Sequence, residues 1–155
     1  MPQMNKGGKF IFGKSLLRAD GRLCIPPGAA REYEIAADGT VILFTGSRST
    51  GGFCVTRPGL LGPSRLGHIL DELPALAARA LPAGAFVRYK GRAYCWLPVS
   101  AHGTLRLTAD VQTFLGLAPG QALLCIRSSD IAFTLGARGP LLERAAQFPG
   151  TIEVF

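Results

Sequence analysis

Long hydrophobic runs are absent from this 155-residue sequence. Residues 1–10 lack the apolar segment of a secretion signal, and no later stretch approaches the roughly eighteen uncharged apolar residues that a membrane-spanning helix needs. We therefore expect a cytoplasmic protein that does not enter a membrane.

The patterns of common metal and catalytic sites are missing as well. The chain has four cysteines, Cys24, Cys54, Cys95 and Cys125. They lie far apart and form no CxxC pair, so we expect reduced, mostly buried thiols and neither a metal site nor a cofactor. The two histidines, His68 and His102, have no nucleophile or ligand partner at an informative spacing. An enzyme is therefore not expected.

Turn-forming residues, by contrast, are abundant. Twenty glycines and eleven prolines divide the hydrophobic residues, which make up 48% of the chain, into short runs. This punctuation favours short strands joined by turns over a helical bundle. We predict an α+β, mainly β fold, either as one domain or as two small halves with a common core.

Positive charge is concentrated in the first part of the chain. Residues 1–92 contain 13 Lys and Arg against 6 Asp and Glu, whereas residues 93–155 contain four of each. The net charge of +7 therefore comes from the first part. A basic surface is typical of proteins that bind a polyanion such as nucleic acid, although charge also serves solubility.

The sequence repeats itself at an offset of 82 residues. The matched residues are Ala19, Gly21 and Leu23 in the first copy and Ala101, Gly103 and Leu105 in the second. Later matches follow with small shifts of register, as loops of different length would produce. The predicted organisation is a flexible N-terminus (1–9), repeat 1 (10–63), a connecting helix kinked at Pro74 (64–82), repeat 2 (83–145) and a C-terminal tail (146–155).

Each repeat is predicted to have the order β-β-α-β-β. The expected hairpins are 10–18 with 22–25, 40–45 with 53–57, 92–100 with 104–108, and 122–128 with 131–135. A Pro-Pro pair should start a short helix at residues 28–35. In the second repeat, Thr108 should cap a helix over residues 109–115, which Gly116 should end.

The motif at residues 21–26, Gly-Arg-Leu-Cys-Ile-Pro, is followed by a helix, an Ala-Asp-Gly turn and a β-hairpin. In this order it resembles the SpoVT/AbrB superfamily of swapped-hairpin transcription factors. Two tandem copies in one chain are similar to the arrangement of the MraZ branch, and the resemblance covers residues 10–58 and 92–136. It implies an interleaved, pseudo-twofold swapped-hairpin barrel that binds double-stranded DNA.

In that superfamily, DNA binding is attributed to arginines around the first hairpins. Carried onto this sequence, the resemblance implicates Arg22 and its neighbours Lys14, Arg18 and Arg31. The second repeat has Thr104 in place of the motif arginine, so repeat 1 is expected to contact DNA. Because one chain then offers only one strongly basic hairpin, we expect a transcriptional regulator that acts as a homo-oligomer.

The basic hairpin also has a simpler explanation. Lys14, Arg18 and Arg22 occupy nearly alternate positions, so at least two of them should share a face. A two-stranded ribbon can enter the major groove, where Arg neutralises phosphate or pairs with guanine. The same face could equally be an ordinary solvated strand surface.

Two further stretches leave alternatives open. The loop at residues 46–53 offers Arg48, three hydroxyls and a Gly pair, which suits either a phosphate contact or a mobile hairpin tip. Residues 87–96 alternate basic and aromatic side chains, which could stack bases, although core packing is expected for Trp96.

A different class of function is the alternative to a regulator. The same barrel could be a non-DNA-binding assembly or small-ligand-binding module. A flat basic stripe across repeat 1 would favour DNA, whereas an apolar cavity with a few convergent polar groups would favour a small ligand.

Overall fold

In the computed structural model, residues 10–147 and 151–155 are described, and they form an α+β, mainly β fold, as predicted. The strands are β1 (Ile11–Leu16), β2 (Arg22–Cys24), β3 (Thr40–Thr45), β4 (Phe53–Thr56), β5 (Val87–Tyr89), β6 (Arg92–Pro98), β7 (Thr104–Arg106), β8 (Ala122–Arg127) and β9 (Phe133–Gly136). The helices are α1 (Pro27–Glu32), α2 (Pro58–Leu61), α3 (His68–Glu72), α4 (Pro74–Ala77), α5 (Ala109–Leu115) and α6 (Pro140–Ala146).

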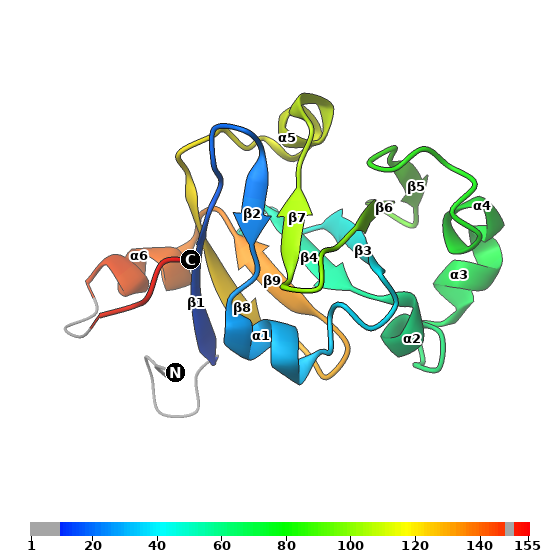
Figure 1. The fold of residues 1–155 in the computed structure, drawn as a ribbon, viewed down its shortest axis with the longest axis horizontal. Coiled ribbons are helices and arrows are strands. Elements are labelled where there is room, and N and C mark those ends of the chain that lie inside the picture. The colour runs from blue at the N-terminus through cyan, green and yellow to red at the C-terminus, as the bar shows by residue number, and fades with distance from the viewer. Residues whose placement is uncertain (1–9, 148–150) are drawn as a thin grey trace.

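Seven of these strands form one antiparallel sheet in the order β1-β8-β9-β4-β3-β6-β5. The other two, β2 and β7, pair with each other and form a ribbon that crosses in front of the sheet (Figure 1). β1 and β5 end the sheet, and no closed barrel is found in the part of the chain that the structure describes.

Strands far apart in the sequence pair with each other. β1 pairs with β8, β3 with β6, β4 with β9 and β2 with β7, so every one of these ladders joins the first part of the chain to the second. The predicted hairpins β3–β4 and β8–β9 are confirmed. The prediction that β1 pairs with β2, and β6 with β7, is wrong.

Burial explains why β2 pairs with β7 and not with β1. The predicted tight turn between β1 and β2 does form, with the Gly21 N–H donating to the Arg18 carbonyl at 2.9 Å. The strand that follows lies across the sheet, where pairing with β7 sets Leu23 beside Leu105. Both leucines are fully buried, which is the apolar burial that drives this arrangement.

The core lies between the sheet and the ribbon. Side chains alternate along a strand, and in the central strands the odd-numbered residues face the ribbon. They are Val41, Leu43, Phe53, Val55, Cys95, Leu97, Leu123, Cys125, Phe133 and Leu135. Three of the cysteines, Cys54, Cys95 and Cys125, are buried free thiols as predicted, and Cys24 is half-buried.

Among the described residues, the opposite face of the sheet, which we call the outer face, is covered only at its two ends. Helices α2, α3 and α4 cover β3, β5 and β6, and α6 with the C-terminal residues covers β1 and β8. The segment 64–82 contains two short helices instead of one kinked helix, because Pro74 has no N–H to continue α3.

The C-terminal residues lie along β1. The Lys14 N–H donates to the Glu153 carbonyl, and the Phe155 N–H donates to the Lys14 carbonyl, both at 2.8 Å. The flexible segment expected at residues 1–9 lies outside the described residues, as do residues 148–150 of the expected tail. In the described ranges, every helix is too short or too polar to cross a bilayer.

Candidate nucleic-acid interface

The ribbon presents one exposed face to solvent. In its antiparallel register, Arg22 lies opposite Arg106, Leu23 opposite Leu105, and Cys24 opposite Thr104. Directly opposed residues point to the same side of a ribbon. Since the leucines point into the core, Arg22 and Arg106 project together from the exposed face.

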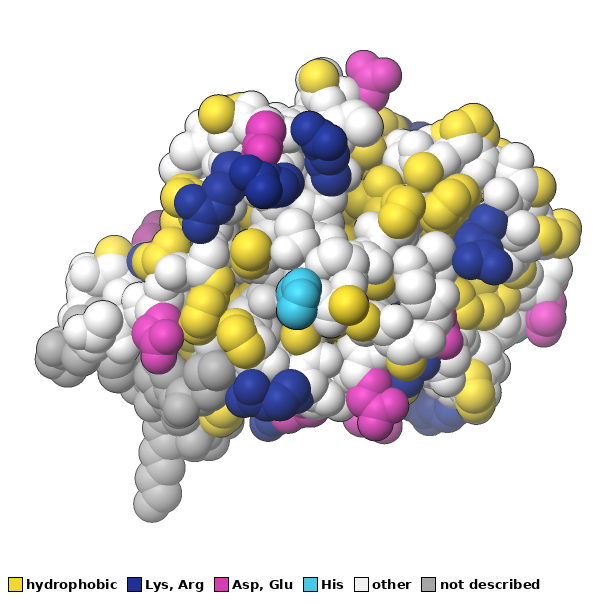
Figure 2. All heavy atoms as spheres, viewed as in Figure 1, with side chains coloured by type: hydrophobic (Ala, Val, Ile, Leu, Met, Phe, Trp, Pro, Cys, Tyr) yellow, Lys and Arg dark blue, Asp and Glu magenta, His cyan; other side chains and the backbone are white. Residues whose placement is uncertain are grey.

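A third arginine joins them through the turn before β2. The Arg18 N–H donates to the Arg22 carbonyl at 2.9 Å, and the Arg18 side chain is exposed. We call Arg18, Arg22, Arg106 and Asp20 the arginine end of the ribbon. Figure 2 shows dark blue side chains gathered at this end of the ribbon, with a single magenta side chain among them.

Asp20 organises the arginine end. Its Oδ2 accepts a hydrogen bond from Arg22 Nε at 2.6 Å, and its Oδ1 accepts one from the Arg22 N–H at 3.1 Å. The backbone N–H of Arg22 is the first cause of a lowered pKa for the Asp20 carboxyl, so this group stays ionised at neutral pH. The three arginines outnumber this one carboxylate, and the end keeps an excess of positive charge.

The other end of the ribbon has different chemistry. Its turn is closed by Ser100, whose Oγ accepts from the Thr104 N–H at 2.9 Å and the His102 N–H at 3.3 Å. Arg31 lies here, beside His102 and Glu34 around a surface depression. The structure therefore separates Arg31 from the arginine end.

Lys14 is also separated from the arginine end. Ser15, its neighbour in β1, points toward the ribbon and donates from Oγ to the Cys24 carbonyl at 2.6 Å. By strand alternation, Lys14 points to the outer face, where it is half-buried beside the C-terminal residues.

Arg48 lies in the loop between β3 and β4. Its carbonyl accepts hydrogen bonds from Arg138 Nε at 3.1 Å and Nη2 at 2.8 Å. The loop hydroxyls bond to one another, with Ser47 Oγ 2.9 Å from Ser49 Oγ and 3.1 Å from Thr50 Oγ1. Its own polar groups and Arg138 therefore hold this loop together.

Sequence reasoning missed Arg106. The repeat alignment superposes Arg22 on Thr104, so the second copy appeared to contribute no arginine to the ribbon. Antiparallel pairing of two equivalent strands instead reverses the order around Leu23 and Leu105, which brings Arg22 opposite Arg106. This partner could have been found by pairing the two copies antiparallel as well as superposing them.

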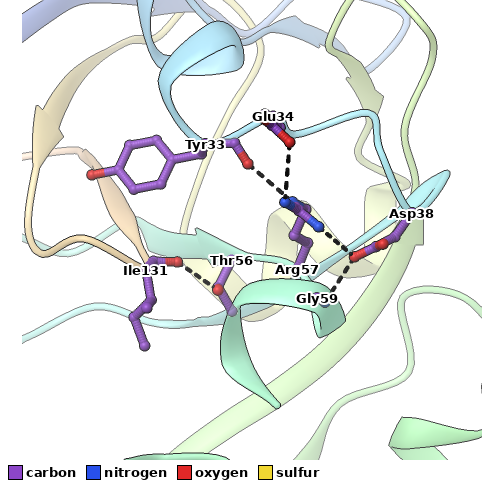
Figure 3. A network of polar contacts seen from close by, with 7 residues as sticks. All are labelled: Tyr33, Glu34, Asp38, Thr56, Arg57, Gly59 and Ile131. Atoms are coloured by element: carbon purple, nitrogen blue, oxygen red, sulfur yellow. Dashed lines mark hydrogen bonds and ion pairs between the residues drawn. The ribbon is translucent and has the colours of Figure 1, made fainter. Parts of the chain in front are cut away.

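Another basic residue, Arg57, is used inside the protein. Figure 3 shows its guanidinium between α1, the turn before β3 and the start of α2. Nε donates to the Tyr33 carbonyl at 2.9 Å, and Nη1 donates to Asp38 Oδ2 at 3.1 Å, which also accepts from the Gly59 N–H at 2.8 Å. Glu34 lies 3.8 Å from Nη2. Asp38 and Glu34 neutralise the charge of Arg57, so we assign this side chain a structural role in holding these segments together.

The alternating basic and aromatic stretch forms the hairpin of β5 and β6. Trp96 is half-buried in the apolar cluster under α2–α4, and its Nε1 donates to the Leu81 carbonyl at 2.7 Å. Core packing therefore accounts for Trp96. No group of three His, Cys, Asp or Glu residues suited to a metal ion occurs in the part of the chain that is described.

Comparisons with known proteins give little to add to this geometry. No family model matches the chain, and no curated protein matches its sequence. The solution structure of PHS018 from Pyrococcus horikoshii is similar over 84% of this chain and 97% of that chain, with 14% sequence identity and a TM-score of 0.35. This degree of likeness does not establish a common fold.

Proposed function

We propose that this chain is a DNA-binding transcriptional regulator of the SpoVT/AbrB type, built from two β-β-α-β-β repeats in an interleaved, swapped-hairpin arrangement. Its backbone pairing supports the two repeats. The Ile25 N–H donates to the Gly103 carbonyl at 2.9 Å, and at the equivalent place the Leu107 N–H donates to the Gly21 carbonyl at 2.8 Å. Two such reciprocal bonds are expected when equivalent strands pair around a twofold axis.

The arginine end of the ribbon is the proposed DNA contact. The observation that carries this proposal is the register that sets Arg22 opposite Arg106 on an exposed face, next to Arg18. A two-stranded ribbon fits the major groove, and guanidinium groups bind phosphate oxygens or the edge of guanine. Lys14, Arg31 and Arg48, which lie elsewhere, are secondary candidates for contacts to the DNA backbone.

The proposed regulator acts as a homo-oligomer. Each chain has one arginine end, because the equivalent turn at the other end of the ribbon carries Ser100 and Thr104. Two chains side by side would present two such ends to one duplex. The second contact is then intramolecular, which raises affinity without any new kind of contact.

Duplex affinity of matched variants tests this function. We expect Arg22→Ala and Arg106→Ala each to weaken binding by about 1–3 kcal/mol if the arginine contacts a base edge, and by less if it contacts phosphate. Thr104→Ala is the matched control, since it alters the half-buried position of repeat 2 that is equivalent to Arg22 and should leave affinity unchanged. Circular dichroism verifies that all three variants are folded.

Salt dependence separates the two kinds of contact. Losing a phosphate contact should make the plot of log affinity against log salt shallower by about one unit, whereas losing a base contact should reduce discrimination between sequences. If folded Arg22→Ala and Arg106→Ala both bind generic duplex as the unmodified chain does, or if that chain binds no duplex at low salt, the proposed function is wrong.

A further inference from the structure

A cleft of about 520 Å3 lies on the outer face of the sheet, on the side opposite the ribbon, and we call it the outer cleft. It is lined by even-numbered residues of the central strands, including Phe44, Cys54, Tyr94 and Thr134. It lies between the two helical covers of this face, where β4 and β9 are left open. Its volume is within the range of roughly 300–1,000 Å3 that is typical of small-molecule sites.

One wall of the outer cleft is a continuous row of rings. Phe44 and Tyr94 are stacked with ring centroids 5.6 Å apart, and Tyr89 follows at 6.5 Å from Tyr94. His68 continues the row at 6.3 Å from Tyr89. Aromatic faces and edges arranged in this way favour a flat apolar molecule packed against them.

The floor of the outer cleft is polar but uncharged. Thr134 Oγ1 lies 3.4 Å from Cys54 Sγ and also bonds to Ser128 Oγ, while Thr56 Oγ1 donates to the Ile131 carbonyl at 2.6 Å. Burial raises the pKa of the Cys54 thiol, so it stays protonated at neutral pH. Because these groups already hydrogen-bond within the protein, the floor suits the uncharged surface of a ligand.

The rim of the outer cleft is cationic. The Arg92 guanidinium lies 5.6 Å above the Phe44 ring and donates from Nη1 to the Thr45 carbonyl at 2.7 Å. The Lys90 ammonium lies 5.4 Å from the Tyr89 ring. Both side chains line the cleft, as does Arg127, whose guanidinium is already paired with the Glu32 carboxylate. No Asp or Glu lines the cleft among the described residues. A negative charge at the rim would therefore meet Arg92 and Lys90 without a competing carboxylate.

We propose that the outer cleft binds a small planar apolar molecule that carries one anionic group, with the rings against its body and Arg92 and Lys90 at its charge. The site is separate from the arginine end, because the two occupy opposite faces of one sheet. Its occupancy does not depend on the proposed DNA function, and each can fail without the other.

Naphthoate is a suitable probe, and naphthylmethanol is its neutral counterpart. NMR titration of the isotope-labelled full chain should shift the amide signals of residues 54–56, 89–94 and 131–134. Naphthoate should bind about tenfold more tightly than naphthylmethanol, as expected for one charge-assisted hydrogen bond near the protein surface.

Two charge variants and one control locate the anion. Arg92→Met keeps an aliphatic stem over Phe44 and should weaken naphthoate binding about tenfold with little effect on naphthylmethanol. Lys90→Asn tests the second cation, because asparagine tolerates the φ of +47° found at Lys90. Arg88→Gln is the matched control on the same hairpin, since Arg88 lies over Phe114 and does not line the cleft.

Equal affinity for naphthoate and naphthylmethanol would overturn the anion preference. Shifts confined to residues away from the cleft, or no shifts at all, would overturn the site itself. Duplex affinity of Arg92→Met should equal that of the unmodified chain, which keeps this test distinct from that of the proposed function.

Discussion

Residues 18–33 and 100–115 follow the same course of tight turn, ribbon strand and helix, yet their side chains differ. Both turns are closed in the same way, by the Gly21 N–H on the Arg18 carbonyl at 2.9 Å and by the Gly103 N–H on the Ser100 carbonyl at 3.0 Å. The two segments therefore share one backbone arrangement, whereas the arginines cluster at only one end of the ribbon.

The helices of the two segments are also held by different means. α1 begins after Pro26 with no side-chain cap, and Tyr33 at its end donates from its hydroxyl to the carbonyls of Ser129 at 2.6 Å and Ala132 at 3.1 Å. α5 begins at Thr108, whose Oγ1 accepts from the Val111 N–H, and Gly116 ends it in the left-handed conformation. The first helix is anchored to a distant loop, and the second is stabilised locally.

The largest expected difference between the segments is at their turn glycines. Gly21 has a φ of +87°, and a Cβ there would lie 2.3 Å from the Leu107 carbonyl oxygen. Gly103 has a φ of +80°, but its nearest neighbour, Ala30 Cβ, would be 3.3 Å away. We expect Gly103→Ala to cost about 1–2 kcal/mol from backbone strain, and Gly21→Ala to cost about 3 kcal/mol or more. Urea unfolding of the two variants measures this, and equal losses would contradict it.

The next effect concerns Tyr33, which has Leu115 as its counterpart in the second segment. Tyr33→Phe should cost about 1–2 kcal/mol at neutral pH, because the Ser129 carbonyl loses its donor. The Ala132 carbonyl still accepts from the Ser129 N–H at 3.0 Å. Burial is the main reason that the pKa of Tyr33 is raised to about 12.

The sign of the pH dependence follows from this raised pKa. Above its ordinary pKa of about 10, Tyr33 ionises in the unfolded chain while it is still protonated in the folded one. The free energy of unfolding should therefore fall as pH rises from 10 toward 12, and it should fall less in Tyr33→Phe. Melting curves of both proteins over this range test the prediction, and parallel curves would refute it.

The smallest expected effect sharpens the contrast in charge. Asp20→Asn removes the only carboxylate of the arginine end and frees Arg22, so duplex affinity at low salt should rise by a factor of about 2–5. Asp130→Asn, which removes an exposed carboxylate from the turn between β8 and β9, is the matched control. A similar rise in both variants would attribute the effect to net charge alone.

Local signals in the sequence predicted most of the elements. The Pro-Pro pair, Thr108 and Gly116 placed the helices α1 and α5, and short apolar runs separated by turn-forming residues placed the hairpins β3–β4 and β8–β9. These features depend on interactions within a few residues, which composition and spacing report directly.

The sequence alone did not predict how the ribbon pairs or where the outer cleft lies. The turn before β2 is compatible with pairing to β1 or to β7, and only the long-range burial of Leu23 beside Leu105 selects β7. The arginine end therefore includes Arg106, which the sequence did not predict, whereas Lys14, Arg31 and Arg48 lie elsewhere. The outer cleft likewise lies between helices α2–α4 and helix α6, which come from distant parts of the chain and leave β4 and β9 uncovered between them.

The pairing of the C-terminal residues with β1 has a consequence for self-association. A strand at the margin of a sheet offers free N–H and C=O groups that a strand of another molecule can adopt. Here the carbonyls and amides of residues 153–155 occupy the groups of Lys14 and Leu16 that face away from β8. This short segment therefore occupies the edge of β1 where a second copy of the chain could otherwise add a strand to the sheet.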